Sequence, residues 1–299
     1  MRRHLAALLF AVLWMTACSG PGEAPSIQAK PLGAEAQEGA GQAVPPPYGF
    51  AVIGDFGTGD AEQQQIADRM CSYRDSHPFD LVITTGDNVY DTGDPSRFDE
   101  AFFNPYKCLH DADVQFRSSL GNHDILTDNG RPELNEPLFG FKGRNYVVRR
   151  GGIRFVIADS NNLNMDWLRK ATRAESGDRW IIAVFHHPVY SPGTGHGSTP
   201  GFRPKLPRLF RRRGVDLVLN GHDHVYAVTK ELRGIRYVVT GGGGARIYGC
   251  EPHDFSARCI EHHHFLYVTA TAGLLTVKAI PDEGPALHSF STDGRDPAS

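Results

Sequence analysis

Short apolar runs recur along the chain, and most of them end in Gly, Asn, Asp or His. Runs of this length with such ends are typical of buried β-strands. Three runs near the C-terminus follow one another without intervening helices, which predicts antiparallel hairpins: 266–270, 274–280 and 287–290. The strands expected before them are 50–53, 81–84, 116–120, 153–158, 180–185, 215–219 and 237–240.

A helix is expected between the first two of these strands. Ile66, Met70 and Tyr73 repeat at helical spacing, and Asp60 with Gln63 three residues later has the pattern of a capped helix start. A strand-helix-strand unit has a right-handed crossover, so its two strands should be parallel. The whole pattern predicts a mixed α/β sandwich.

The first residues have a different pattern. Arg2 and Arg3 precede an apolar run at 5–14 that is too short to span a membrane, and this layout is typical of an export signal. The four residues that end at Cys18 resemble a bacterial lipobox, which implies removal of residues 1–17 and lipidation of Cys18. We therefore expect an exported lipoprotein at the bacterial cell envelope or in the periplasm, with a plain secretory signal as the alternative.

Residues 18–47 are rich in Gly, Ala, Pro, Gln and Glu and have almost no large apolar side chains, so a disordered tether is expected there. Residues 48–299 are then the catalytic domain. The net charge of −3 gives no global field toward nucleic acid or an anionic membrane. We expect a monomer that has no nucleic-acid partner and meets a membrane only through Cys18.

Four further cysteines suggest two disulfides in an oxidising compartment. The sequence leaves three connectivities open, and pairing Cys71 with Cys108 and Cys250 with Cys259 closes the shortest loops. A zinc site built from all four is disfavoured because no Cys-x-x-Cys pair occurs.

Acids, amides and histidines gather at five places, each directly after an apolar run. In open α/β sheets the carboxyl ends of the strands share one edge, so these distant segments should converge there. Glycines beside them let the backbone turn sharply. One such segment alone could be a helix cap or a turn, but five in order predict a single site: 54–57, 86–90, 121–124, 186–188 and 221–224.

Carboxylate oxygen, amide oxygen and imidazole nitrogen together suit Fe, Mn or Zn better than Ca or Mg. If Asp87 bridges two ions about 3.5–4 Å apart, the site can activate a water and hold phosphoryl oxygens. The pattern therefore predicts a two-metal phosphoesterase. Its candidate ligands are Asp55, Asp87, Asn122, His186, His222 and His224.

These motifs resemble those of the calcineurin-like metallophosphoesterases and, within them, the purple acid phosphatases of the short, tartrate-resistant kind. The resemblance covers about 48–291, and its most specific mark is Tyr90, three residues after Asp87. Trp167 and Leu168 are also similar, whereas Ala183 stands where the family often has Val. The resemblance implies a sandwich of two mixed β-sheets flanked by helices, with the metal site at the C-terminal ends of strands.

The resemblance also implies two metal ions, Fe(III) together with Fe(II), Zn(II) or Mn(II), and a hydroxide between them as nucleophile. The implied ligands of the ferric ion are Asp55, Asp87, Tyr90 and His224. Those of the divalent ion are Asp87, Asn122, His186 and His222. His123 and His196 are implied to face the substrate, where His123 stabilises charge or protonates the leaving alkoxide; His187 has no implied role and is expected to be structural.

Three features outside these motifs are expected to have no role in the chemistry. Arg208 and residues 211–213 should form the wet face of a helix, although they could attract anionic substrates. Residues 241–244 suggest a tight turn, because no Lys-Ser/Thr pair follows as in a P-loop. Residues 262–264, three histidines, are expected at the surface or rim.

The sequence therefore predicts an exported acid phosphatase that acts on phosphate monoesters. Three other functions remain open: a phosphodiesterase on the same centre, a non-catalytic ligand-binding lipoprotein, and a redox enzyme that uses a ferric/ferrous pair. The first differs only in the pocket around the leaving group, and the other two would release no phosphate.

Overall fold

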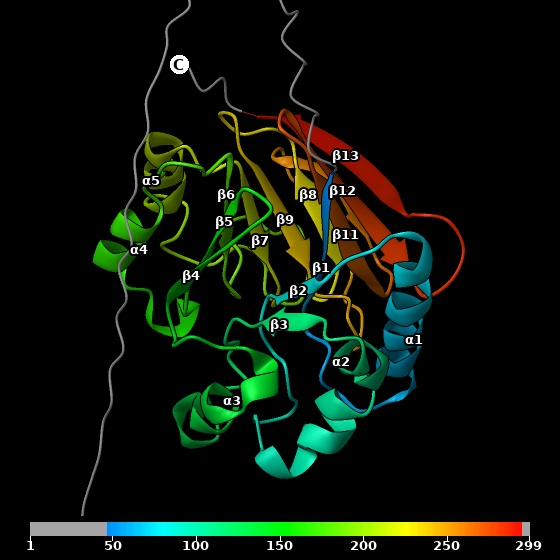
Figure 1. The fold of residues 1–299 in the computed structure, drawn as a ribbon. Helices are drawn as coiled ribbons and strands as arrows, with labels where there is room; N and C mark the ends of the chain where they lie inside the picture. Colours follow the sequence, from blue (N-terminus) through cyan, green and yellow to red (C-terminus); the bar gives the residue numbers. More distant parts are fainter. Residues whose placement is uncertain (1–46, 295–299) are drawn as a thin grey trace, which may run out of the picture. The chain divides into compact units, whose positions relative to one another are not determined.

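Two mixed β-sheets form the frame of residues 47–294, the part of the chain that the computed structural model describes (Figure 1). The six-stranded sheet has the order β13-β12-β11-β1-β2-β3, and the seven-stranded sheet has the order β10-β8-β9-β7-β6-β5-β4. The mixed α/β sandwich predicted from the sequence is confirmed. The expected signal segment, Cys18 and the tether up to residue 46 lie outside the described residues.

The six-stranded sheet contains the predicted parallel unit and the predicted hairpins. Its parallel strands are β1 (Tyr48–Ile53), β2 (Leu81–Thr84) and β3 (Gln115–Arg117). Its antiparallel strands are β11 (His264–Ala270), β12 (Leu274–Pro281) and β13 (His288–Asp293). The third strand is predicted to reach residue 120, but it ends at Arg117; beyond it the N–H of Ser119 still donates to the carbonyl of Thr84, at the end of β2, at 3.2 Å.

Helix α1 (Ala61–Ser76) makes the crossover from β1 to β2 and buries Ile66, Met70 and Tyr73, as the spacing predicted. The predicted cap is wrong in detail. Asp60 occupies the N-cap position, but its side chain makes no capping hydrogen bond. Instead Gln63 reaches back and accepts a hydrogen bond from the backbone N–H of Gly59 at 2.7 Å.

The seven-stranded sheet has four parallel central strands: β5 (Ile153–Ile157), β6 (Trp180–Val184), β7 (Leu217–Asn220) and β9 (Arg236–Thr240). Three antiparallel strands that the apolar runs did not indicate complete it: β4 (Tyr146–Arg150), β8 (Tyr226–Thr229) and β10 (Ser256–Ile260). Helices α4 (Met165–Ala171) and α5 (Leu206–Arg213) pack on the outer face of this sheet.

Short helices connect the remaining strands. They are α2 (Lys107–Asp111), α3 (Arg131–Asn135), a π-helical turn (Asp99–Phe103) and 3₁₀ turns at Pro95–Arg97, Asp128–Gly130, Pro137–Phe139 and Ser160–Asn162. No helix in residues 47–294 is long and apolar enough to cross a membrane.

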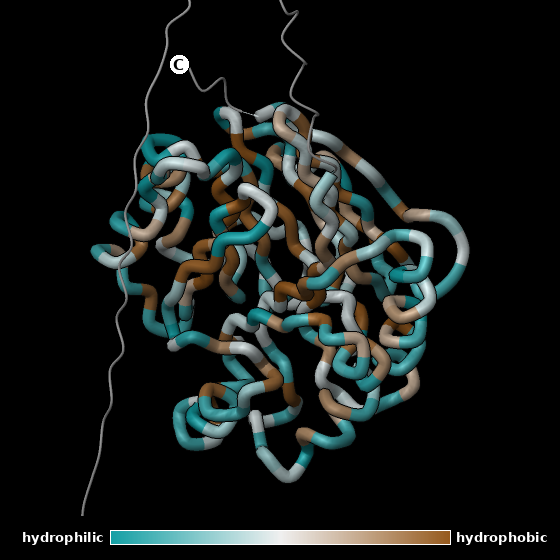
Figure 2. The backbone as a smooth tube through the Cα atoms, in the orientation of Figure 1, coloured by the Kyte–Doolittle hydropathy of each residue, from teal (hydrophilic) through white to brown (hydrophobic). Residues whose placement is uncertain are grey.

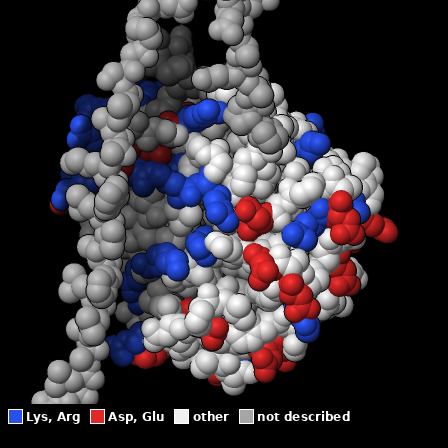
Figure 3. Space-filling view, in the orientation of Figure 1, with Lys and Arg blue, Asp and Glu red and all other residues white. Residues whose placement is uncertain are grey.

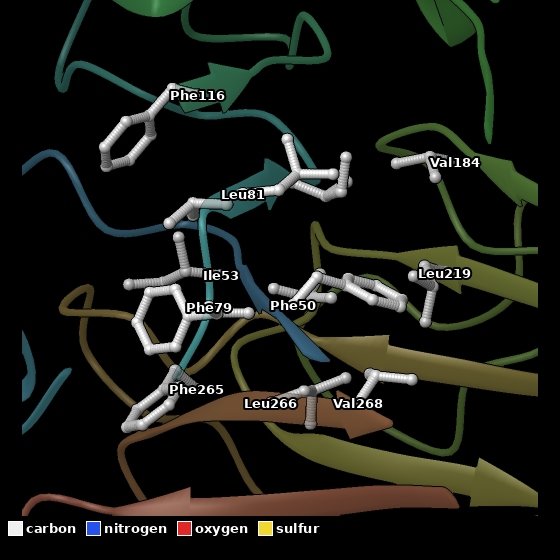
Figure 4. Packing of buried hydrophobic residues seen from close by; sticks show 14 of the residues in the cluster. Phe50, Ile53, Phe79, Leu81, Phe116, Val184, Leu219, Phe265, Leu266 and Val268 are labelled. Atoms are coloured by element: carbon white, nitrogen blue, oxygen red, sulfur yellow. The ribbon is translucent and has the colours of Figure 1, made fainter. Parts of the chain in front are cut away.

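The main apolar core lies between the two sheets. Phe50 of β1 and Val268 of β11 lie toward Val184 and Leu219 of the facing sheet (Figure 4). Each such side chain contributes about 1.5–3 kcal/mol when it is fully buried. Hydrophobic segments accordingly follow the central strands, and hydrophilic ones the helices and loops around them (Figure 2). This packing fixes the strand ends, from which the five motifs extend.

Two disulfides join elements at the periphery. Cys71–Cys108 links α1 to α2, and Cys250–Cys259 links the loop after β9 to β10. Of the three possible connectivities, the structure has the one that closes the shortest loops.

Candidate metal centre

The five motif segments meet at the carboxyl ends of strands from both sheets. The backbone N–H of Asp55, after β1, donates to the carbonyl of Gly86, after β2, at 3.0 Å. The N–H of Gly221, after β7, donates to the carbonyl of His186, after β6, at 2.9 Å. The N–H of His123 donates to the carboxylate of Asp87 at 2.9 Å, so the third segment joins the others. The predicted convergence is therefore present.

Three of the candidate ligands have a left-handed backbone. The φ angles are 56° at Asp55, 52° at Asp87 and 73° at His222. This region costs a residue with a side chain roughly 1–2 kcal/mol, and it persists only where surrounding contacts hold it. Here the Asp55 carboxylate accepts the backbone N–H of His222 with both oxygens, each at 3.0 Å. The sharp turns point all three side chains into one space.

A first group of donor atoms surrounds the hydroxyl of Tyr90. This oxygen lies 3.1 Å from Oδ2 of Asp87, 3.4 Å from Oδ1 of Asp55 and 3.2 Å from Nε2 of His224. The last two atoms are 3.5 Å apart. These are the four residues expected around the ferric ion.

A second group surrounds Nε2 of His186. This nitrogen lies 3.0 Å from Oδ1 of Asn122, 3.1 Å from Nδ1 of His222 and 3.4 Å from Oδ2 of Asp87. These are the four residues expected around the divalent ion. The same Asp87 oxygen belongs to both groups, so a bridging position is available.

The hydrogen bonds of two histidines select the nitrogen that can bind a metal. Nδ1 of His186 lies 2.9 Å from the carbonyl of Thr85, and Nδ1 of His224 lies 2.8 Å from the carbonyl of Arg246. A carbonyl oxygen only accepts, so each Nδ1 carries a proton, and Nε2 is the nitrogen whose lone pair a metal ion can take once any proton there has left. Such a partner is common behind metal-binding histidines.

The buried carboxylates make the centre attract positive charge. Burial lowers the pKa of His186, but Asp87 and Asp55 outweigh it and raise this pKa to about 9. Burial and then the same two carboxylates raise the pKa of Tyr90 well above its usual value. Burial and the neighbouring His186 lower the pKa of His222 to about 2, so that imidazole is neutral.

The donor set fits transition-metal ions. Asp55, Asp87 and His186 are buried, and each offers a ligand atom within 4.8 Å of the others. A phenol oxygen, two carboxylates, an amide and three imidazoles together match Fe, Zn or Mn better than the all-oxygen shells of Ca or Mg. Buried carboxylates this close together call for a compensating cation.

The two histidines expected to face the substrate lie beside these groups. His123 packs against Tyr90 with ring centroids 4.6 Å apart, and its Nδ1 bonds the carbonyl of Asp91 at 2.6 Å, which leaves Nε2 free. The exposed His196 stacks on His222 with ring centroids 4.0 Å apart.

His187 and Tyr248 also contact the ligand groups. His187 bonds Ser160 through Nδ1 at 2.8 Å, and its ring centroid lies 4.5 Å from that of His222. Burial, with His186 nearby, lowers the pKa of His187 to about 4. Tyr248 was missed: it stacks on His224 with ring centroids 4.2 Å apart, yet no motif surrounds it in the sequence.

Two features outside the motifs make contacts that the sequence did not indicate, and one of them, His264, lies in the interior rather than at the expected surface or rim. The glycines at 241–244 do more than turn the chain: a Cβ on Gly243 would lie 2.6 Å from the carbonyl of Gly54, and one on Gly244 would lie 2.6 Å from that of Phe56. They let this segment pack directly against the first motif. His264 is fully buried and bonds Thr240 at 3.1 Å, whereas His262 is exposed as expected.

The chain is similar in sequence to purple acid phosphatases. The chain is 29% identical over 232 residues to purple acid phosphatase 17 of Arabidopsis thaliana, and this match covers 65% of this chain and 68% of that protein. It is 27% identical over 301 residues to purple acid phosphatase 4 of the same plant, and this match covers 86% of this chain and 88% of that protein.

Solved structures share the fold. The purple acid phosphatase PPD1 of yellow lupin (Lupinus luteus) superposes with a TM-score of 0.71 at 20% identity, over 83% of this chain and 54% of that chain. GAP50, the anchor in the inner membrane complex of Plasmodium, has the same TM-score at 18% identity, over 84% and 90%. The family model of the calcineurin-like phosphoesterases matches residues 48–226. The chain belongs to the calcineurin-like phosphoesterase family.

Proposed function

We propose that this protein is an exported acid phosphatase that hydrolyses phosphate monoesters at a dinuclear centre of Fe(III) and Fe(II), Zn(II) or Mn(II). The observation that carries the proposal is the position of Asp87 Oδ2, which lies 3.1 Å from the Tyr90 hydroxyl and 3.4 Å from Nε2 of His186. One carboxylate oxygen is thus common to two complete donor groups. The similarity to purple acid phosphatases supports the choice of monoesters.

The proposed ligands divide as the two donor groups do. Asp55, Asp87, Tyr90 and His224 would hold the ferric ion, and Asp87, Asn122, His186 and His222 the divalent ion. When bound, the two ions supply a nucleophile by acidifying a water, and they stabilise the charge on the phosphoryl oxygens.

The histidines beside the ligands would act on the substrate itself. Nδ1 of His123 is engaged by the Asp91 carbonyl, so Nε2 is free to protonate the leaving alkoxide. His196 is exposed above His222 and would donate to a phosphate oxygen. Tyr248 covers one face of His224 and would keep water away from the ferric site.

Export and anchoring through Cys18 belong to the same proposal. The two disulfides in the folded part support an oxidising compartment. Mass spectrometry of the mature protein from its native host should find Cys18 as a lipidated first residue, and a Cys18→Ser variant should leave the membrane fraction. An unmodified Cys18 inside a longer, soluble chain contradicts the anchor.

Tyr90→Phe tests the ferric site. A phenolate on Fe(III) absorbs in the visible by charge transfer, so the aerobically purified wild type should be pink to purple. The variant keeps the ring and its packing but loses the oxygen, so the colour should vanish while the fold survives. Tyr248→Phe is the matched control, because Tyr248 lies beside the centre but is not among the proposed ligands, and it should stay coloured.

Activity is tested on the same preparations with metal analysis. Wild type should contain two ions per chain and release phosphate from an aryl monoester faster than from the matching diester. Iron-loaded protein without colour would reject Tyr90 as a ligand. Faster cleavage of the diester would assign the centre to phosphodiesters, and two bound ions without any hydrolysis would favour the non-catalytic or redox functions.

A further inference from the structure

A basic groove lies between helices α4 and α5, outside the metal centre. It has a volume of about 540 Å³. Met165 and Leu209 are its two apolar lining residues, and the other five are cations: Arg169, Lys205, Arg208, Arg212 and Arg213. None of the seven lining residues is acidic or aromatic.

The groove follows one face of each helix. Met165 and Arg169 are four residues apart on α4, and Lys205, Leu209 and Arg213 continue the same spacing on and beside α5. Eight residues at 1.5 Å per residue span about 12 Å. The cations are therefore spread along a line rather than gathered at one point.

These cations have few acidic partners. Arg169 pairs with Asp166 at 2.6 Å on the exposed surface. Among the described residues, no carboxylate lies within ion-pair distance of Lys205, Arg208 or Arg212. Their charges are therefore available to a ligand.

Helix stability does not explain this arrangement. Arginines in the last turn of α5 are favourable, because cations interact well with a helix C-terminus. Lys205 and Arg208 lie at its start, where cations are unfavourable and where α5 has no acidic residue. A ligand would account for cations at both ends.

The charge is also concentrated on this part of the molecule. Residues 146–216 contain 13 Lys and Arg against five Asp and Glu, although the whole chain has a net charge of −3. Figure 3 shows basic side chains gathered on the side where Figure 1 places α4 and α5, and acidic side chains on the side of α1. Such a one-sided field attracts polyanions.

The groove continues toward the metal-centre edge of the sheet. Met165 and Lys205 also line an adjoining pocket of about 170 Å³ together with Leu163 and Phe202. Leu163 follows the 3₁₀ turn Ser160–Asn162, whose first residue contacts His187. A ligand in the groove would lie beside the loops that surround the centre.

We propose that this groove is a second anion site and that it binds a linear chain of phosphate groups of the polyphosphate type. Guanidinium groups pair with phosphate oxygens through two parallel hydrogen bonds, and five cations along about 12 Å exceed what one phosphate can engage. A bilayer surface does not enter a concave groove. Single-stranded nucleic acid is disfavoured because no aromatic ring for base stacking lines the groove beside its cations; Phe202 lines only the adjoining pocket.

The test measures binding of a labelled linear inorganic polyphosphate to the full protein at several salt concentrations. Saturating orthophosphate is present to occupy the metal centre. The double variant Arg208→Gln/Arg212→Gln removes two groove charges. The matched control Lys170→Gln/Arg211→Gln removes two exposed charges from the same two helices outside the groove.

The groove variant should bind polyphosphate about tenfold more weakly than wild type. The slope of log Kd against log salt concentration should also fall by roughly 1.5, since two fewer phosphates are neutralised. The control should change binding less than about twofold. Hydrolysis of a small aryl phosphate should be the same in all three proteins. Because binding is measured without turnover, this test stands even if the proposed phosphatase activity fails.

Three results would overturn the proposal. Equal weakening of binding in both double variants would mean that polyphosphate is bound only by the overall positive field of this side of the protein. Equally tight binding of a single-stranded oligonucleotide or of anionic lipid vesicles, with the same dependence on Arg208 and Arg212, would assign the groove to another ligand. Full displacement of the polyphosphate by the saturating orthophosphate would mean that polyphosphate binds only at the metal centre.

Discussion

At the scale of single residues, two buried aspartates hold the motif loops without being proposed as ligands. Asp124 accepts the backbone N–H groups of Asn88 at 2.7 Å, Val89 at 3.2 Å and Gly121 at 2.7 Å, so it ties the second motif to the third. Asp223 does the same at the fifth motif, where it accepts the N–H of His196 at 2.7 Å. The positions of the ligands thus depend on carboxylates one or two residues away from them.

His123 and the ligands should be separable by mutation. His123→Ala removes the proposed proton donor but no proposed ligand, so both ions should stay bound while kcat falls by roughly 10²–10⁴-fold. Metal analysis and monoester kinetics check this. Asp91→Ala is a useful control, because its backbone carbonyl, which orients His123, is retained. Loss of an ion from the His123 variant would mean that this residue is itself a ligand.

At the scale of helices and strands, the sequence predicted the elements whose burial is continuous. β2, β5, β6 and β7 are buried along their whole length and were read from their apolar runs. β4 and β10 are edge strands with exposed or half-buried residues, so their apolar signal is weak. β8 is buried, but it has only four residues and begins two residues after His224, so its short apolar run is not separated from the fifth motif.

The same limit applies to the site. All the expected ligands lie after predicted strands, so topology alone brings them to one edge. Tyr248 comes from an irregular loop, and nothing local indicates that its ring will stack on His224. The packing of Gly243 against Gly54 is likewise a contact between distant segments, which spacing along the chain cannot show.

The two disulfides should contribute unequally to stability. Cys71–Cys108 spans 37 residues and Cys250–Cys259 spans 9, and the entropy of loop closure makes the longer loop worth about 1 kcal/mol more. Replacing both cysteines of a pair by Ser should therefore lower the free energy of unfolding more for the first pair. Urea unfolding of the two double variants measures the difference; a larger loss in the second pair would contradict the chain-entropy account.

The second disulfide should matter more for activity. Cys250 pairs with Gly193 in an isolated antiparallel β-bridge. The N–H of the next residue, Thr194, donates to the carbonyl of Gly249 at 2.9 Å. These contacts join the loop of Tyr248 to the loop of His196. The Cys250→Ser/Cys259→Ser variant should lose turnover, whereas Cys71→Ser/Cys108→Ser should keep it at temperatures where the protein stays folded.

At the scale of the whole molecule, folding creates a site whose charge is balanced only by a bound cation or proton. Asp55 and Asp87 are almost completely buried, and His186, which follows β6, is fully buried. A bound metal ion supplies the positive charge, and it competes with protons for the imidazole nitrogens. The stability of the entire domain should therefore depend on metal and on pH together.

Metal-free protein should lose stability as the pH rises from roughly 6.5 to 9. The carboxylates of Asp87 and Asp55 raise the folded-state pKa of His186 from 6.5 to about 9, so its proton stabilises the fold fully below pH 6.5 and is lost through about pH 9. The loss should amount to a few kcal/mol, at about 1.4 kcal/mol per pKa unit. Tm measured against pH, with chelator and after reconstitution, checks this. Metal-loaded protein should lack this decline because the ions replace the proton, and metal-free His186→Gln should lack it because the titrating group is gone. A metal-free wild type whose Tm is constant over this range would show that the carboxylates do not hold a proton on His186.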